Sequence, residues 1–118
     1  MIYVIGIGPG SKELMTMQCI DAIKYAEVIV GYKTYINLIT DLIEGKEVVQ
    51  NGMRQEIDRC REAVEIAKTG KKVAVISSGD AGIYGMAGLI LELTAKEEQN
   101  IDVKVVPVLA ISTASLHL

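Results

Sequence analysis

The fold of this chain is decided by the stretch Val73-Ala74-Val75-Ile76-Ser77-Ser78-Gly79-Asp80-Ala81-Gly82-Ile83-Tyr84-Gly85. Its first five residues are mostly aliphatic and carry no charge, which is typical of a strand buried on both faces. Small residues follow, and from Ile83 onward hydrophobic residues recur at helical spacing. The stretch therefore predicts a buried strand, a glycine-rich turn and a helix, the unit from which parallel α/β sheets are built.

The same order of strand, turn and helix repeats on both sides of this stretch. Strands are expected at 2–7, 27–30, 47–49, 73–77 and 101–106, and helices at 15–26, 35–42, 57–67 and 83–94. The pattern predicts an α/β protein: one five-stranded, mainly parallel sheet flanked by helices, forming a single domain over residues 1–118. The fifth strand alternates hydrophobic and charged residues, so we expect it to be half exposed or covered by something outside this chain.

Helical periodicity indicates which residues face the core. The helix at 57–67 is expected to bury Ile57, Cys60, Val64 and Ala67 and to leave Arg54, Asp58, Arg59 and Glu65 outside. The helix at 83–94 is expected to bury a broader set, namely Ile83, Met86, Ala87, Ile90, Leu91 and Thr94. Both cysteines fall on such faces and lack a CxxC spacing, which predicts buried, reduced thiols.

Composition excludes several classes of protein. A formal net charge of -3 without a basic cluster argues against a general nucleic-acid binder. The single histidine, His117, lies near the end of the sequence, so no metal site is expected. No hydrophobic stretch reaches the roughly 20 residues of a membrane span, and the first residues form a strand instead of a signal peptide. We therefore expect a cytoplasmic protein without membrane contact.

Glycine-rich segments follow two of the expected strands, at 6–10 and 79–85. Ligands bind at the carboxyl ends of the strands in open α/β sheets, and glycines let a ligand approach the backbone. A dinucleotide fingerprint fits poorly, because Ser11 stands at the third glycine position and Pro9 lacks an amide proton. A structural turn without a ligand remains an alternative for the first segment. Asp80 could cap the following helix or bind a ligand.

Four segments together resemble the tetrapyrrole (corrin/porphyrin) methylase family. They are Gly6-x-Gly8-Pro9-Gly10, the run from Ala26 to Tyr35, Gly52-Met53-x-x-Glu56-x-x-Arg59-Cys60-x-x-Ala63, and the run from Ser77 to Gly88. The resemblance extends over residues 1 to about 107 and is closest to the precorrin-3B C17-methyltransferase branch of cobalamin biosynthesis. It implies a fold of two α/β domains, of which this chain matches the first. It also implies S-adenosylmethionine as the cofactor, bound between the domains, and a precorrin in an adjoining trough.

The resemblance also implies which residues form the site. The cofactor-binding positions would be Pro9, Ser78, Gly79, Asp80, Ile83 and Tyr84, together with Ser112 and Thr113 after the fifth strand. Pro107 is not followed by the glycine that the family has there. Tyr32, Lys33 and Tyr35 would face the tetrapyrrole carboxylates. Alternatively, the two tyrosines bury their rings and Lys33 is solvated.

The expected activity is methyl transfer to a precorrin or cobalt-precorrin ring carbon, C17, with this chain as half of the enzyme. No catalytic residue is assigned, because transfer from a sulfonium needs alignment more than a protein nucleophile. The alternative is a non-catalytic remnant or binding domain. In either case we expect a homodimer or higher oligomer, or a partner that carries the second domain, to cover a hydrophobic surface near the fifth strand.

Overall fold

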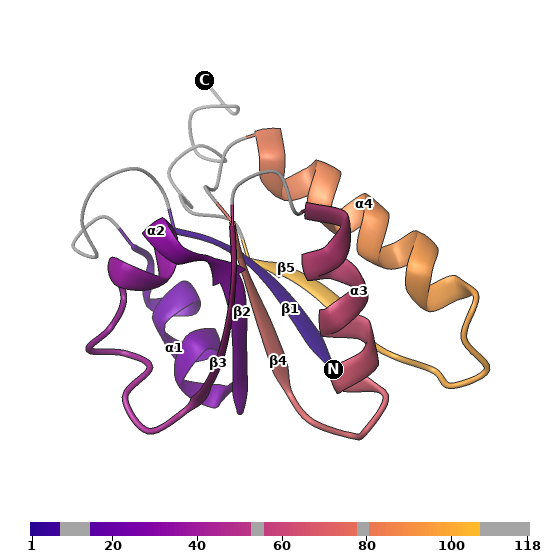
Figure 1. The fold of residues 1–118 in the computed structure, drawn as a ribbon, viewed down its shortest axis with the longest axis horizontal. Helices are drawn as coiled ribbons and strands as arrows, with labels where there is room; N and C mark the ends of the chain where they lie inside the picture. Colours follow the sequence, from indigo (N-terminus) through magenta and orange to yellow (C-terminus); the bar gives the residue numbers. More distant parts are fainter. Residues whose placement is uncertain (8–14, 53–55, 78–80, 107–118) are drawn as a thin grey trace.

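A five-stranded sheet lies between two layers of helices (Figure 1). The structure, a computed structural model, describes residues 1–7, 15–52, 56–77 and 81–106. The sheet has the order β3-β2-β4-β1-β5, and every strand pair is parallel. The strands are β1 (Ile2–Gly6), β2 (Val28–Tyr32), β3 (Glu47–Asn51), β4 (Val73–Ser77) and β5 (Val103–Val106). The predicted fold class is confirmed.

Two helices cover each face of the sheet. One face carries α1 (Met17–Tyr25) and α2 (Lys33–Asn37), and the other carries α3 (Glu56–Ala67) and α4 (Ala81–Ala95) (Figure 1). Thr16 begins α1, because its hydroxyl oxygen accepts a hydrogen bond from the Cys19 amide at 3.1 Å. The strands point their carboxyl ends toward the upper side of Figure 1, which is also where α3 and α4 begin.

The sheet divides the hydrophobic interior into two cores. Alternate strand residues face opposite sides, so Ile5 and Ile29 pack under α1 and α2, whereas Val4 and Val30 pack under α3 and α4. Cys19 and Cys60 are both fully buried, one in each core. The predicted burial of the thiols is confirmed, and the sheet between them keeps them from forming a disulfide.

Several details of the helices differ from the sequence-based predictions. The second helix was expected at 35–42 but ends at Asn37, and short-range turns follow in which the Leu38, Ile39 and Leu42 amides donate to the third carbonyl before them. Ile57 and Leu91, expected in the core, are 54% and 53% exposed because they lie on the outer sides of α3 and α4.

The largest correction concerns Arg59, which was expected outside and is only 5% exposed. Arg59 precedes Ala63 by four residues on α3, so its stem lies in the same row of side chains that packs on the sheet.

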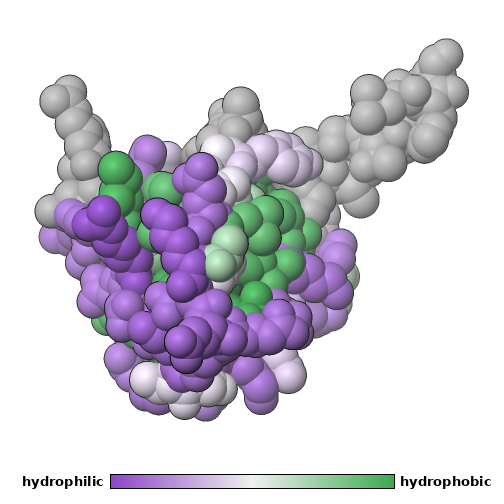
Figure 2. Space-filling model, turned by 90° about the vertical axis from the view of Figure 1, so that its right-hand side faces the viewer, coloured by the Kyte–Doolittle hydropathy of each residue, from purple (hydrophilic) through white to green (hydrophobic). Residues whose placement is uncertain are grey.

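Hydrophobic residues also reach the surface beside α4. Figure 2 shows a hydrophobic area on the side of the molecule that α4 covers, bordered by hydrophilic residues. Partly buried hydrophobic residues of α4 and the segment through β5 pack on this side: Leu89, Leu93, Ile101, Val103 and Val105. In β5, Lys104 is exposed between half-buried valines, as its alternating sequence predicted. Over the part of the chain that the structure describes, no helix has the length and hydrophobicity to span a membrane.

Candidate functional site

The carboxyl ends of β1 and β4 lie side by side at the centre of the sheet. Gly6 pairs in register with Ser77, and the Ile7 amide donates to the Ser77 carbonyl oxygen at 3.1 Å. After β1 the chain continues to α1 on one face, and after β4 it continues to α4 on the other. The two connections therefore diverge, which is the arrangement that creates a ligand crevice in open α/β sheets. The prediction that both glycine segments follow strands ending at one edge is confirmed for the strand ends, whereas Gly8 and Gly79 lie outside the described residues.

Most of the expected cofactor-binding residues fall outside the described ranges. These are Pro9, Ser78, Gly79, Asp80, Ser112 and Thr113. Ile83 and Tyr84 are described, and they differ sharply, since Ile83 is fully buried in the core under α4 and Tyr84 is 65% exposed. The side chain of Ile83 is therefore not accessible to a ligand, whereas that of Tyr84 is.

A cavity of about 210 Å³ opens beside the carboxyl ends of β2 and β4. Its lining comes from the two strands and from α2, α3 and α4: Tyr32, Tyr35, Glu56, Arg59, Ile76, Ser77, Gly85 and Met86. Tyr32 and Tyr35 pack edge to face, with ring centroids 5.6 Å apart and an interplanar angle of 83°. The structure therefore brings together two of the three expected substrate residues. Lys33 is exposed and does not line the cavity.

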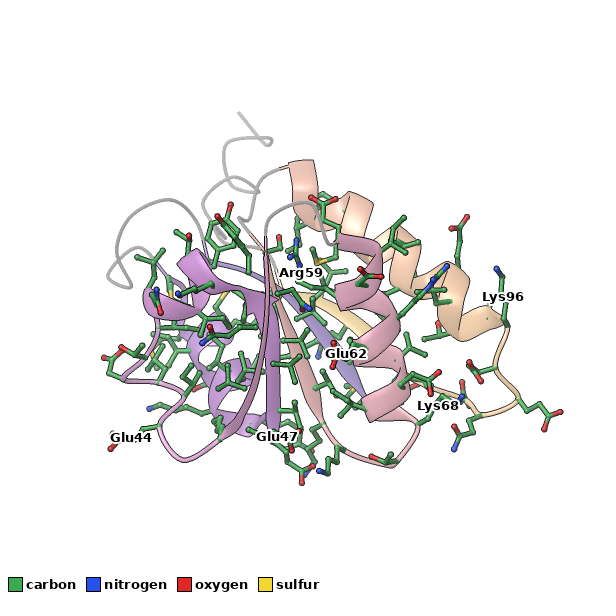
Figure 3. The ribbon with its side chains drawn as sticks, in the orientation of Figure 1. Glu44, Glu47, Arg59, Glu62, Lys68 and Lys96 are labelled. Atoms are coloured by element: carbon green, nitrogen blue, oxygen red, sulfur yellow. The ribbon has the colours of Figure 1, made fainter. Side chains whose placement is uncertain are left out.

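Arg59 is the residue of this cavity that the sequence-based reasoning missed. Figure 3 shows it near the top of α3, where that helix begins beside the strand ends. Its Nη1 donates to the Gly52 carbonyl oxygen at 3.0 Å, which ties α3 to the segment after β3. The signal that could have found it is its spacing, four residues before Ala63 and one before Cys60.

The two thiols near this end of the sheet are poor nucleophiles. Burial raises the pKa of Cys60 to about 11, an effect that the positive charge of Arg59 opposes and the negative charge of Glu56 reinforces. Burial also raises the pKa of Cys19, whose Sγ donates to the Gly6 carbonyl oxygen at 3.3 Å. Since the thiolate is the reactive form, neither residue suits nucleophilic catalysis. Within the described residues, no three His, Cys, Asp or Glu side chains form a group able to hold a metal ion.

Other hollows lie away from the strand ends. One of about 290 Å³ follows the edge between α1 and β5, and its lining includes Tyr3, Tyr25 and Lys104. Another of about 420 Å³ lies at the end of α4, where Glu97 and Glu98 belong to its lining. Both are larger than the cavity at Arg59, but neither adjoins the carboxyl ends of the central strands, so we favour the smaller cavity as the functional one.

Known proteins similar to this chain are cobalamin-pathway methyltransferases. A probable cobalt-factor III C(17)-methyltransferase of Salmonella typhimurium is 51% identical over 118 residues, covering 100% of this chain and 49% of that protein. A precorrin-3B C(17)-methyltransferase of a Sinorhizobium species is 37% identical, covering 80% of this chain and 37% of that protein. Among solved structures, the crystal structure of the methyltransferase CobJ matches with a TM-score of 0.78 and 31% identity, covering 98% of this chain and 49% of that one.

The chain spans about half the length of the first of these relatives. The family model that it matches describes the Tetrapyrrole (Corrin/Porphyrin) Methylases and covers residues 1–116. On the strength of that match and of the fold, the chain belongs to the tetrapyrrole methylase family.

Proposed function

We propose that this chain supplies the cofactor-binding half of a cytoplasmic, S-adenosylmethionine-dependent methyltransferase. The enzyme would methylate C17 of a precorrin or cobalt-precorrin in cobalamin biosynthesis. The observation that carries the proposal is the pairing of Gly6 with Ser77, the last residues of two neighbouring strands whose following helices diverge to opposite faces. Family membership and the relatives named above support the same activity.

The described residues at this crevice fit a ligand that binds close to the backbone. Gly6 has no side chain, and Ser77 has a small one and lines the cavity at this end of the sheet, so both central strands end in residues that let a ligand approach the backbone. The side chain of Ile83 is fully buried and anchors the first turn of α4 in the core. When bound, S-adenosylmethionine supplies a methyl group on a sulfonium that is its own leaving group.

The chain's own residues would act by binding and alignment. Tyr32 and Tyr35 offer aromatic surface and two hydroxyl groups to a macrocycle beside the crevice, and Lys33 offers a positive charge to its acidic side chains. Holding two reactants in a fixed geometry is itself a large part of catalysis when no protein nucleophile takes part. We propose Pro9, Ser78, Gly79, Asp80, Tyr84, Ser112 and Thr113 as further cofactor contacts, on the family resemblance.

A second domain would complete the site. We propose that the hydrophobic residues exposed beside α4 and β5 are covered in a homodimer or by a partner that carries this domain, because soluble proteins rarely expose large hydrophobic areas. Sedimentation at micromolar concentration tests this, and a clean monomer would contradict it.

Calorimetry of the purified chain with S-adenosylhomocysteine tests cofactor binding. We expect weak binding, because part of the contacts would come from the second domain. Gly79→Val should abolish it by filling the space next to the ligand, whereas the matched Gly88→Val should not, since a Cβ on Gly88 of α4 meets nothing within 4 Å.

Binding without methyl transfer, even with the missing half added in trans, would favour a non-catalytic binding domain. If calorimetry detects no heat at millimolar S-adenosylhomocysteine, the proposed cofactor site of this chain is refuted and the alternative of a non-catalytic remnant is favoured.

A further inference from the structure

Arg59 is a buried cation. Its side chain is 5% exposed, although arginines are almost never fully buried unless paired. Taking a guanidinium out of water is costly, and a protein normally offsets the cost with a carboxylate or with several hydrogen bonds. Among the residues that the structure describes, no carboxylate forms an ion pair with it.

The hydrogen bonds of Arg59 leave most of its donors unused. A guanidinium carries five N–H groups, and within the described ranges only Nη1 finds an acceptor, the Gly52 carbonyl oxygen at 3.0 Å. Its Nε is buried and has no hydrogen-bond partner there. Because a buried donor without a partner is destabilising, such groups in a native protein call for a specific explanation.

The surroundings of Arg59 point to a ligand. Arg59 lines the cavity of about 210 Å³ that Tyr32 and Tyr35 also line, at the end of the sheet where α3 begins (Figure 3). A second buried polar atom without a partner, Oδ1 of Asn51, belongs to the residue paired in register with Tyr32. Two tyrosines and a guanidinium that has no ion-pair partner among the described residues thus line one small cavity.

Among the described residues of the lining, Glu56 is the only acidic one, and it lies one turn before Arg59 on α3. Its side chain is exposed and makes no ion pair with Arg59. The negative charge of Glu56 is stabilised where it is, since carboxylates in the first turn of a helix interact favourably with the helix dipole. The positive charge of Arg59 therefore remains available inside the cavity.

We propose that this cavity is a carboxylate-binding site in which the guanidinium of Arg59 binds a ligand carboxylate, with Tyr32 and Tyr35 beside it. A guanidinium matches a carboxylate geometrically and forms strong, charge-assisted hydrogen bonds with it. Two ligands of the proposed function carry this group: the acidic side chains of a tetrapyrrole and the amino-acid end of the methyl donor. The site itself does not depend on that function, whereas the choice between these two sources rests on it.

Two glycines of α4 provide matched variants. Gly85 lines the cavity, whereas Gly88, one turn further along, does not. A Cβ added at either position meets nothing within 4 Å, so both tolerate a side chain in the unliganded protein. Gly85→Leu should fill the cavity and Gly88→Leu should leave it open, while both variants favour the helix.

The direct test uses sodium propionate as the probe and the Arg59 Nε–H resonance of the ¹⁵N-labelled chain as the readout, assigned by its loss in Arg59→Lys. We expect a saturable shift with propionate that sodium chloride at the same ionic strength does not produce. Gly85→Leu should weaken the binding by about ten- to hundredfold, and Gly88→Leu should change it by less than about twofold. Glu56→Gln should strengthen it, because it removes a nearby negative charge.

The source of the carboxylate is found by titrating uroporphyrin III and S-adenosylhomocysteine into wild type, Gly85→Leu and Arg59→Met. Weakened binding of uroporphyrin alone would identify the tetrapyrrole side chains, and weakened binding of S-adenosylhomocysteine alone would identify the methyl donor. If propionate shifts the Arg59 resonance but neither larger ligand binds, the carboxylate site stands and the proposed function fails. No saturable shift with propionate, or equal binding in folded Gly85→Leu and Gly88→Leu, overturns the site.

Discussion

At the amino ends of the strands, neighbouring segments satisfy one another's polar groups, whereas at the carboxyl ends two buried polar atoms find no hydrogen-bond partner among the described residues. The Glu27 amide donates to the Lys72 carbonyl oxygen at 2.8 Å, and the Lys72 amide donates back to the Glu27 carboxylate at 3.0 Å. Lys46 Nζ donates to the carbonyl oxygens of Lys24 and Ala26, at 2.8 and 2.6 Å, where α1 ends.

At the carboxyl ends of the same strands, Arg59 Nη1 donates to the Gly52 carbonyl oxygen at 3.0 Å and the Ile7 amide donates to the Ser77 carbonyl oxygen at 3.1 Å, but other buried polar groups are not satisfied in this way within the described part of the chain. Nε of Arg59, a residue of the cavity lining, and Oδ1 of Asn51 are buried there without a hydrogen-bond partner in the described ranges. Unsatisfied buried groups cost stability, so they are retained where a ligand can satisfy them. The difference supports the proposal that the carboxyl ends bind a ligand, whereas the hydrogen bonds at the amino ends stabilise the fold. Four predictions test this division, from the largest expected effect to the smallest.

Gly31→Ala should lower the free energy of unfolding by about 1–3 kcal/mol, because the core under the carboxyl end of β2 is densely packed. A Cβ at Gly31 would lie 3.1 Å from Cδ1 of Ile36 and 3.2 Å from Cβ of Ile76. Urea denaturation measures the change. The control, Gly85→Ala, enters open space on α4 and should instead stabilise by about 0.5–1 kcal/mol. Equal losses of unfolding free energy in the two variants would show that the core around Gly31 is packed no more tightly than the space around Gly85.

Raising the pH from 8 to 10 should destabilise the wild type more than Cys60→Ala. The unfolded thiol loses its proton near the ordinary pKa of 9.0, whereas the folded protein keeps it protonated up to a pKa of about 11. The stabilisation is therefore complete below pH 9 and is lost as the pH rises toward 11. Linkage gives a difference of about 1.3 kcal/mol at pH 10. Urea denaturation of both proteins at each pH measures it, and superimposable pH profiles would contradict the burial of this thiol.

Lys46→Met should lower the free energy of unfolding by about 1 kcal/mol, because two hydrogen bonds from a cation to the last carbonyls of α1 are lost. Lys96→Met is the control, since Lys96 is exposed and its side chain makes no hydrogen bond with the described residues. Thermal unfolding followed by circular dichroism measures both. If the two variants unfold at the same temperature, the ties at the amino ends contribute nothing to stability.

Glu47→Gln should change stability by less than about 0.5 kcal/mol, and the change should vanish in about 1 M salt. Glu47 pairs with Lys71 at 3.4 Å, and the two side chains are 55% and 48% exposed, so water screens the attraction. A larger effect in a urea titration would mean that surface charges matter more at the amino ends than hydrogen bonds to the backbone.

The sequence predicted the fold well because hydrophobic periodicity depends on local structure. The bounds of the strand Val73–Ser77 agree with the prediction to the residue, since five uncharged residues are followed there by a glycine-rich sequence. The order of the strands was not predictable in the same way, because it depends on which face each connecting helix covers. The C-terminal end of the second helix is predicted too far along the chain. Its hydrophobic spacing continues to residue 42, whereas the helix ends at Asn37 and turns follow.

The candidate site was predicted only in part. Tyr32 and Tyr35 were named from the sequence, and they line one cavity. The helical pattern of hydrophobic residues at 57–67 predicts Arg59 outside, because polar residues occupy the exposed face of an amphipathic helix. A guanidinium on a long apolar stem can occupy a buried row when a cavity adjoins it, and that cavity exists only in the folded chain. Six of the expected cofactor residues fall outside the described ranges, and their roles stay predictions.

The sheet also partitions the protein into two interiors that share no helix, one containing Cys19 and the other Cys60. Residues in one interior are separated from those in the other by a full layer of backbone, and distant substitutions usually have additive effects. Each helical layer can therefore accumulate amino-acid substitutions without compensating substitutions in the other layer. Only the strand ends, where α2, α3 and α4 meet around one cavity, require the two layers to change together.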